Sequence, residues 1–323
     1  MKRIFLLIAF FAVLLDMPFL FAECVGPECL PEDIRQICVE EKRDGCIDWE
    51  NHILYAVGIA APNPKFKTKA QQYTTAVKAA RINAQANLLE MVQEVQITSA
   101  HMVKDRMYEQ GMETYQLKGL IKHFSLVGKP AQLSNGAIIV TGRMFLKDIR
   151  EFMAERKLLP NERDSGNVES GRLAPPPDTS EKTGLQLSRR QSEEQPERGE
   201  FEATDRADRI YNGLIVDTRG FGIKPVTYPN ILDERGMEVY GSTHIDHAYA
   251  IRQGTAGYTK SIERARKSPR FGTEGAEPLE IRATGQGKTP FDVVISNKDA
   301  VLLRKLNATQ TFLREGRVMI VVD

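Results

Sequence analysis

A long polar segment in the middle of the chain constrains its fold more than any other feature. Residues 159–207 are rich in Pro, Ser, Glu and Arg, include three consecutive prolines and contain a single aromatic residue, Phe201. Such a composition cannot bury enough apolar surface to offset the chain entropy lost on folding. The sequence therefore predicts a disordered linker between an N-terminal domain at 51–158 and a C-terminal domain at 208–323. Each flanking part has the usual size of an independent domain.

The first 22 residues have the layout of a secretory signal peptide. Lys2 and Arg3 form a short positive region, Ile4–Leu15 is an unbroken apolar run, and Ala22 offers a small residue for cleavage. An apolar run of this length is too short to span a bilayer core, which needs about 20 residues. We expect an exported chain that loses residues 1–22, with an uncleaved N-terminal anchor as the alternative.

All four cysteines of the chain follow at once, within residues 23–50: Cys24, Cys29, Cys38 and Cys46. An even number of cysteines behind an export signal indicates two disulfides in an oxidising compartment. Three connectivities are open at this point. A metal site would need closely spaced ligand pairs that are missing here, and free thiols are the remaining alternative. The residue before Cys24 is acidic, so this cysteine does not fit a lipobox.

The N-terminal domain is predicted to be an α+β layer in which strands pack under one long helix. Its clearest pattern is a stripe of apolar and small residues at helical period, made of Tyr73, Val77, Ala80, Ala84, Leu88, Met91 and Val95. The small alanines would let this helix lie close to a sheet. Strands are expected at 53–60, 95–98, 120–127 and 137–146, and further helices at 101–116 and 147–158.

Five segments in this domain, in the same order, resemble the LPP-twenty family of outer-membrane lipoproteins. They are Ala76–Leu89, Val95–Ser99, Val103–Asp105, Gly119–Ile121 and Ala137–Leu146. The resemblance covers about a third of the chain. It implies a structural or assembly role in the bacterial envelope, as in the proteins of the flagellar basal disk. It carries over no catalytic residues, and the missing lipobox departs from the family pattern.

The C-terminal domain is also predicted to be α+β, so each domain should hold a small mixed or antiparallel sheet covered by helices. Strands are expected at 213–217, 228–232, 237–240, 279–284, 291–296 and 317–322, and helices at 256–267 and 297–315. Ser296 and Asp299 form a capping signal for the last helix. The inner face of that helix is predicted to carry Val301, Leu302, Lys305, Leu306, Thr309 and Leu313.

Two motifs in the C-terminal domain are candidates for chemistry. Gly285–Thr289 is similar to the end of a phosphate-binding loop, but it lacks the first glycine and the following helix, so a hairpin turn is the better interpretation. His244, Asp246 and His247 form a compact cluster that could bind metal or, with Ser242, act in hydrolysis. No nucleophile-elbow motif accompanies them. The preferred interpretation of the cluster is a polar loop–helix junction.

A basic stretch follows this cluster and is the candidate interaction surface, made of Lys260, Arg264, Arg266, Lys267 and Arg270. It is either a solvated helix face or a contact for peptidoglycan, anionic lipid headgroups or an acidic partner. The chain as a whole has 44 Lys and Arg against 43 Asp and Glu. Without an overall positive field, nucleic acid is not an expected partner.

Two functions follow from these features. The first is a non-enzymatic structural or assembly protein in the periplasm or at the outer membrane. It would bind envelope proteins or itself, with contact to peptidoglycan or the outer membrane and an association with the flagellum among the expectations. The alternative is an exported hydrolase acting on a cell-wall component through His244, Asp246 and His247. Neither function implies a cofactor.

Overall fold

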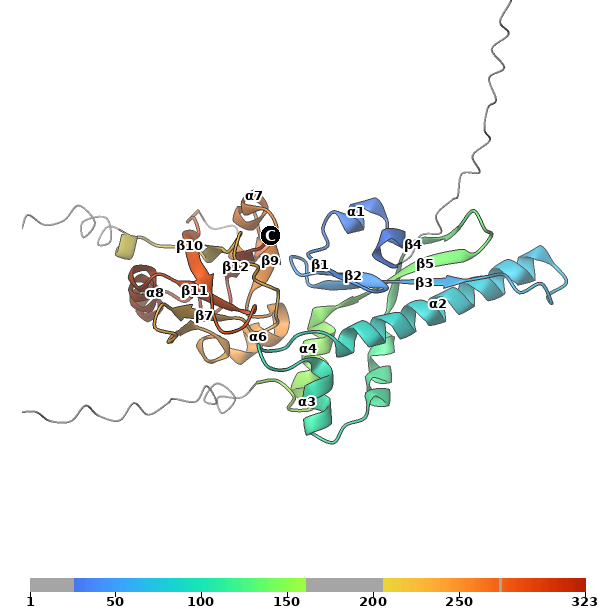
Figure 1. The fold of residues 1–323 in the computed structure, drawn as a ribbon, viewed down its shortest axis with the longest axis horizontal. Helices are drawn as coiled ribbons and strands as arrows, with labels where there is room; N and C mark the ends of the chain where they lie inside the picture. The colour runs from blue at the N-terminus through green and yellow to red at the C-terminus, as the bar shows by residue number, and fades with distance from the viewer. Residues whose placement is uncertain (1–25, 161–205, 273–274) are drawn as a thin grey trace, which may run out of the picture.

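The computed structural model describes residues 26–160, 206–272 and 275–323, which form two α+β domains lying end to end (Figure 1). The expected signal peptide, Cys24 and nearly all of the expected linker lie outside the described residues. Each domain is built on one sheet, antiparallel in the N-terminal domain and mixed in the C-terminal domain. The predicted fold class is therefore confirmed.

The N-terminal domain contains a five-stranded antiparallel sheet in the order β1-β2-β3-β5-β4. Its strands are β1 (Glu40–Lys42), β2 (Gly45–Asp48), β3 (Ile53–Ala60), β4 (Ser125–Gln132) and β5 (Ile138–Phe145). Its helices are η1 (Gly26–Cys29), α1 (Glu32–Arg35), α2 (Lys69–Gln93), α3 (Val103–Glu109), η2 (Thr114–His123) and α4 (Leu146–Glu155).

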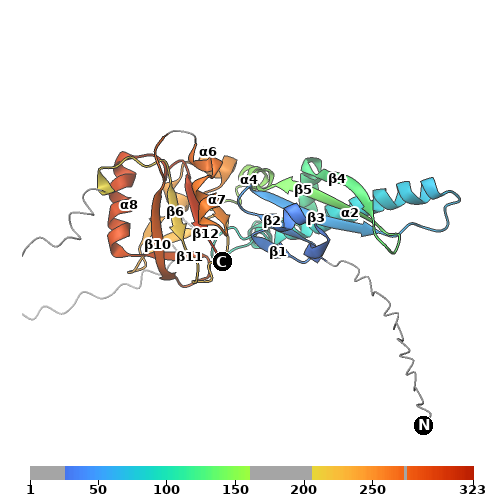
Figure 2. The same ribbon diagram turned by 90° about the horizontal axis from the view of Figure 1, so that it is seen from above.

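Both faces of this sheet are covered. The long helix α2 covers one face, while η1 and α1 lie on the other (Figures 1 and 2). Leu30 and Ile34 pack there in one buried cluster with Tyr55. Strands β1 and β2 belong to the same sheet, and Cys46 pairs with Tyr55 of β3. The expected boundary at residue 50 is therefore wrong, because it would cut the sheet between β2 and β3.

Helix α2 lies close to the sheet for the reason that its sequence suggested. A Cβ atom added to Gly58 of β3 would stand 2.1 Å from the carbonyl oxygen of Ala80 and 2.3 Å from the nitrogen of Ala84. Only glycine allows the helix backbone to come this near. The buried residues of α2 are Ala76, Ala80, Ala84, Leu88, Met91 and Val92. Tyr73 was expected among them but is 45% exposed, because the first turns of α2 extend past the end of β3.

The C-terminal domain contains a seven-stranded mixed sheet in the order β8-β7-β11-β10-β6-β12-β9, in which β10, β6, β12 and β9 run parallel. Its strands are β6 (Leu214–Asp217), β7 (Asn230–Asp233), β8 (Glu238–Tyr240), β9 (Gly257–Thr259), β10 (Leu279–Gln286), β11 (Asp292–Ile295) and β12 (Val318–Val321). Its helices are η4 (Ser242–His244), α6 (His247–Gln253), α7 (Ile262–Arg266), η5 (Pro269–Phe271) and α8 (Asn297–Thr309).

Several predicted elements of this domain are confirmed. Residues 285–289 lie at the antiparallel β10–β11 connection and not at the start of a helix, as the hairpin interpretation required. The hydroxyl of Ser296 accepts a hydrogen bond from the Asp299 amide at 3.0 Å and so caps α8. The inner face of α8 is partly different from the prediction, since Ala300 and Leu303 are buried and Val301 is 63% exposed.

Three predicted elements are wrong. The expected helix at 256–267 begins as the edge strand β9 and continues as the short α7, because Ala256 to Thr259 are buried beside β12. The expected strand at 95–98 is a loop, whose carbonyl groups bond to the C-terminal domain instead of a neighbouring strand. The expected strand at 120–127 begins only at Ser125, after the 3₁₀ helix η2.

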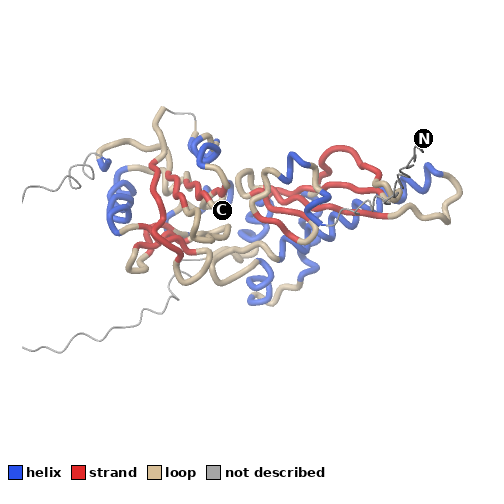
Figure 3. The backbone as a smooth tube through the Cα atoms, turned by 45° about the horizontal axis from the view of Figure 1, so that its top comes forward, coloured by secondary structure: helices blue, strands red, loops and turns tan. Residues whose placement is uncertain are grey.

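The two domains share one hydrophobic core. A single cluster of buried residues runs from the α2 side of the first sheet into the second sheet. Figure 3 shows the strands of both sheets in red, with loops in tan between them, and α6 of the second domain contacts α4 of the first. The interface between the domains, which the linker prediction did not foresee, is therefore part of the folded core.

Candidate functional site

Backbone hydrogen bonds join the domains directly. The amides of Thr227 and Tyr228 donate to the carbonyl oxygens of Gln96 and Ile97, both at 2.9 Å. The hydroxyl of Thr227 donates to the same Gln96 oxygen at 2.8 Å. The loop after α2 is thus held by the C-terminal domain, which explains why its alternating sequence does not form a strand within its own sheet.

A pair of buried aromatic rings packs across the interface. Trp49, the single tryptophan of the chain, meets Tyr258 edge to face with ring centroids 5.7 Å apart. Trp49 is 1% exposed and Tyr258 is fully buried. The indole donates to Glu40 at 2.8 Å, and the Tyr258 hydroxyl donates to the carbonyl of Val226 at 3.0 Å. Both polar groups therefore keep a partner inside the interface, as buried polar groups require.

Two arginines from different domains form hydrogen bonds with the end of α6: Arg150 of α4 and Arg270 of η5. We call them the arginine pair. Arg150 donates to the carbonyl groups of Ile251 and Arg252, and Arg270 to those of Gln253 and Gly254. The last carbonyls of a helix lack intrahelical partners and carry a partial negative charge, so they favour cations. Burial lowers the pKa of each arginine to about 10.

His52 lies beside the arginine pair. Its Nε2 lies 2.5 Å from Nη2 of Arg270, so the imidazole accepts a hydrogen bond and is neutral. Burial, and then the charges of Arg270 and Arg150, lower the pKa of His52 well below its ordinary value. The two arginines thus bind the carbonyls at the end of α6, and His52 accepts a hydrogen bond from one of them, which links the two domains.

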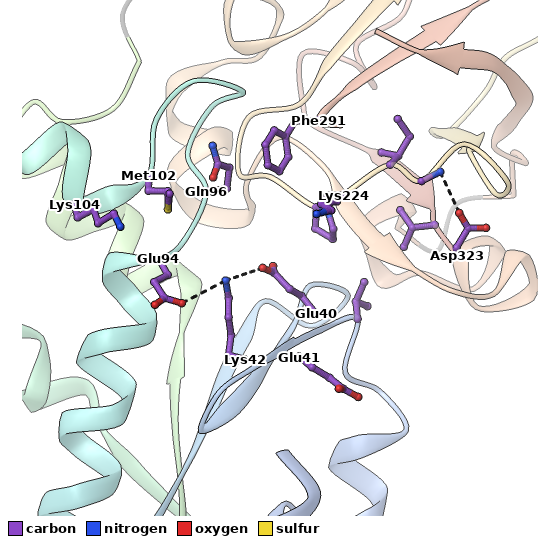
Figure 4. Close-up of a pocket in the computed structure, with 15 residues that line it drawn as sticks. Glu40, Glu41, Lys42, Glu94, Gln96, Met102, Lys104, Lys224, Phe291 and Asp323 are labelled. Carbon is purple, nitrogen blue, oxygen red and sulfur yellow. Dashed lines mark hydrogen bonds and ion pairs between the residues drawn. The ribbon is translucent and has the colours of Figure 1, made fainter. Parts of the chain in front are cut away.

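A cleft of about 710 Å³ opens between the domains next to this junction (Figure 4). One wall comes from β1, the end of α2 and the segment from Gln96 to Lys104 at the start of α3. The other comes from the loop after β6, from Phe291 and from the residues that follow β12. The segments after β6 and β12 leave the carboxyl ends of parallel strands, which is where ligands bind in open α/β sheets. Clefts at domain interfaces are a second common place for binding sites.

The cleft contains charges of both signs. Lys42 is paired with Glu40 at 2.8 Å and with Glu94 at 3.8 Å. Lys104 and Lys224 are exposed and form no ion pair with any described residue. These two lysines come from opposite walls, so the cleft offers unpaired cations from both domains (Figure 4).

The remaining lining groups are acidic or apolar. The Asp323 carboxylate accepts hydrogen bonds from the amides of Gly220 at 2.7 Å and Gly222 at 3.3 Å, so it is held by the loop after β6. Met102 and Phe291 give the cleft apolar surface. The cleft therefore presents lysines, carboxylates and apolar side chains together.

The predicted His/Asp cluster is not assembled into one site. His244 lies 3.2 Å from Glu238, and its hydrogen bond lowers the pKa of that carboxyl group. Asp246 lies 3.7 Å from Arg314. His247 is exposed and lines, with Ser242, a small cavity of about 240 Å³. Among the described residues, no group of three or more His, Cys, Asp or Glu side chains could hold a metal ion.

The predicted basic surface is largely used inside the molecule. Arg264 pairs with Glu50 of the N-terminal domain at 2.9 Å, and Arg266 pairs with Glu280 at 2.5 Å. Arg270 belongs to the arginine pair. Lys260 and Lys267 are exposed. Three of the five cations thus have partners within the chain, and the use of the stretch as a surface for an outside partner stays a prediction.

The cysteine prediction is confirmed where the structure describes it. Cys38 and Cys46 form a disulfide with their Cα atoms 5.9 Å apart. Cys29 is disulfide-bonded as well. The Cys38–Cys46 bond lies on the sheet face that η1 and α1 cover, so it fastens this cover to β2.

A comparison with known protein families gives a match for the C-terminal domain. Residues 213–323, about a third of the chain, match the family described as Treponema pallidum Tp0624, second domain. The matched range begins one residue before β6 and includes the whole seven-stranded sheet. No curated protein matches the chain. Within the described residues, no helix is both long and apolar enough to cross a membrane. The C-terminal domain is thus similar to a recognised domain unit.

Proposed function

We propose that this protein is a non-enzymatic assembly protein of the bacterial envelope, and that it binds a polypeptide segment of an envelope partner in the cleft between its domains. The observation that carries the proposal is the composition of that cleft. Lys104 and Lys224 extend from opposite walls without an ion-pair partner among the described residues, beside Met102 and Phe291. A partner segment with acidic and apolar side chains would satisfy both features.

Three features support an envelope location. The N-terminal apolar run has the layout of an export signal. The Cys38–Cys46 disulfide is typical of proteins in oxidising compartments. The resemblance of residues 76–146 to the LPP-twenty family points to the outer membrane or the flagellar basal disk. The match of residues 213–323 to the family described as the second domain of Tp0624 fits a modular protein in which such a unit follows another domain.

The rigid interface gives the proposal its mechanism. The walls of the cleft belong to different domains. If the domain junction were flexible, part of the binding free energy would be lost in ordering the two walls around a partner. The shared core, the arginine pair and the Trp49–Tyr258 contact hold the walls at a fixed separation before any partner arrives. A preorganised cleft binds more tightly because its walls lose little conformational entropy when a partner binds.

The test compares three variants of the full chain in the native organism. The cleft variant carries Lys104→Glu and Lys224→Glu. A matched control reverses the charge of one exposed lysine in each domain, outside the cleft: Lys118→Glu and Lys305→Glu. The third variant carries His244→Ala, Asp246→Ala and His247→Ala. Each is measured for envelope or motility phenotype and for recovery of the wild-type partner in chemical crosslinking.

We expect the cleft variant to lose the crosslinked partner and the phenotype, while the other two variants behave as wild type. A cleft variant that keeps the partner at the level of the matched control would contradict the proposal. Loss of function in the His/Asp variant, with the protein folded and abundant, would replace it with the exported-hydrolase function.

A further inference from the structure

The end of the N-terminal domain that points away from the C-terminal domain has an unusual charge pattern. Residues 51–89 and 124–147 contain no Asp or Glu. The register of the sheet brings these two stretches together, because Ala60 at the end of β3 pairs with Ile138, and Ile138 pairs with Gln132 at the end of β4. Within the described chain, the ends of β3, β4 and β5 and the first part of α2 therefore contribute no carboxylate to this end.

Lysines fill this end. We call it the cationic end and define it by five exposed lysines from the loop before α2, the first turns of α2 and the end of β4: Lys65, Lys67, Lys69, Lys78 and Lys129. None of them forms an ion pair with another described residue. Two aromatic rings stand among them, Phe66 at 38% exposed and Tyr73 at 45% exposed. The surface is thus cationic and aromatic at the same time.

Hydrogen bonds order the loop before α2, which carries Lys65, Phe66 and Lys67. The amides of Lys65 and Phe66 bond to the side-chain and main-chain oxygens of Asn63, at 3.0 and 3.2 Å. The Gln72 side chain donates to the carbonyl of Phe66 at 2.9 Å. Phe66 is therefore presented outward between two lysines by a structured turn.

Local electrostatics does not account for these lysines. Lys65, Lys67 and Lys69 lie just before or in the first turn of α2, a helix of 25 residues with no acidic side chain in that turn. The start of a helix carries a partial positive charge, which favours anions and disfavours cations. Figure 1 shows this part of α2 and the loop before it reaching beyond the sheet, with no other element of the described chain covering them. An anion from outside the chain would remove this repulsion.

We propose that the cationic end docks on the surface of an anionic lipid bilayer. Lysines close to such a surface are attracted by its negative potential, and aromatic side chains settle at the headgroup level. The exposed Phe66 between Lys65 and Lys67 offers both contacts within three residues. Nucleic acid would use the same charges, but a narrow turn with one ring at its tip gives no groove to follow a strand. The proposal does not depend on the cleft, which opens next to the domain junction.

The test measures sedimentation of the full chain with two kinds of vesicle, one of phosphatidylcholine alone and one of equal parts phosphatidylcholine and phosphatidylglycerol. The test variant carries Lys65→Ser, Lys67→Ser and Lys69→Ser. The matched control carries three substitutions at exposed lysines elsewhere, Lys118→Ser, Lys267→Ser and Lys305→Ser. A second variant, Phe66→Ser, probes the ring alone. Circular dichroism confirms that each variant is folded, and all variants share the same N-terminal apolar segment.

Each lysine near an anionic surface contributes about a fivefold gain in binding. We therefore expect the triple variant to bind phosphatidylglycerol vesicles at least tenfold more weakly than the matched control. Phe66→Ser should weaken binding as well, and added salt should weaken wild-type binding by screening. Equal loss in the triple variant and the matched control would overturn the proposal. So would equal binding of wild type to both vesicles, or displacement of the protein from vesicles by DNA of mixed sequence at low concentration.

Discussion

Removing the ring of Tyr258 should separate the two domains while leaving each one folded. The ring packs on Trp49 across the interface, and its hydroxyl bonds to Val226 within the C-terminal domain. Two substitutions divide these roles. Tyr258→Phe keeps the ring and removes the hydroxyl, whereas Tyr258→Ala removes both.

The structure sets the expected sizes. Deleting a buried aromatic side chain costs about 3–5 kcal/mol, and an edge-to-face pair adds about 1 kcal/mol. The hydroxyl makes two hydrogen bonds to Val226, each worth about 1 kcal/mol net. Tyr258→Phe should therefore lower the free energy of unfolding by about 1–2 kcal/mol, and Tyr258→Ala, which also loses the ring and its contact with Trp49, by about 5–8 kcal/mol.

Trp49 makes the assay selective, because it is the single tryptophan and it lies in the interface. Urea unfolding is followed by tryptophan emission and by far-ultraviolet circular dichroism. In wild type and Tyr258→Phe the two signals should change together, as one cooperative unit requires. In Tyr258→Ala the emission should be red-shifted before urea is added. If Tyr258→Ala keeps the wild-type emission, or is no less stable than Tyr258→Phe, the ring contact does not hold the domains together.

Three further results are expected. Gly58→Ala should lower the free energy of unfolding by about 3 kcal/mol, because its Cβ would meet the α2 backbone, whereas Gly119→Ala, which has nothing within 4 Å, should change it little; urea midpoints check both. His52 stays neutral in the folded protein but binds a proton in the unfolded chain, so the free energy of unfolding should fall as the pH drops below 6.5. The fall should be smaller in His52→Asn, where asparagine also tolerates the positive φ at this position, and thermal melts across a range of pH test this. Trypsin should cut first within 160–206, yet the pieces should co-elute in gel filtration until urea is added; pieces that separate in buffer would contradict the shared core.

Sequence reasoning worked best where a residue pattern is set by local packing. The stripe through Ala80, Ala84 and Leu88 predicted both the helix and its close approach to the sheet, because small side chains at helical period have few other uses. The cap at Ser296 was found for a similar reason, since its hydrogen bond lies within one turn. Such features depend on neighbours a few residues away, and so they are written in the sequence.

Prediction failed where distant parts of the chain decide the local structure. Residues 95–98 alternate like a strand, but their carbonyl groups bond to Thr227 and Tyr228, more than a hundred residues away. Residues 257–259 looked helical together with the residues after them, yet they join the parallel edge of the second sheet beside β12. In both cases tertiary hydrogen bonds override the local preference.

The basic residues also show that contacts between distant parts of the chain, and not local sequence, decide which of them are available to a partner. Arg264, Arg266 and Arg270 looked like an outward surface because cations are usually solvated, but each is bound to a group elsewhere in the chain. The predicted interaction surface did not include Lys65 and Lys67, although no described residue forms an ion pair with them. What separates the two groups is the distribution of carboxylates and helix carbonyls in space. A cation is a candidate for binding an outside partner when the fold leaves it without an anion, and in this protein that condition points to the cationic end and the cleft lysines instead of the basic stretch.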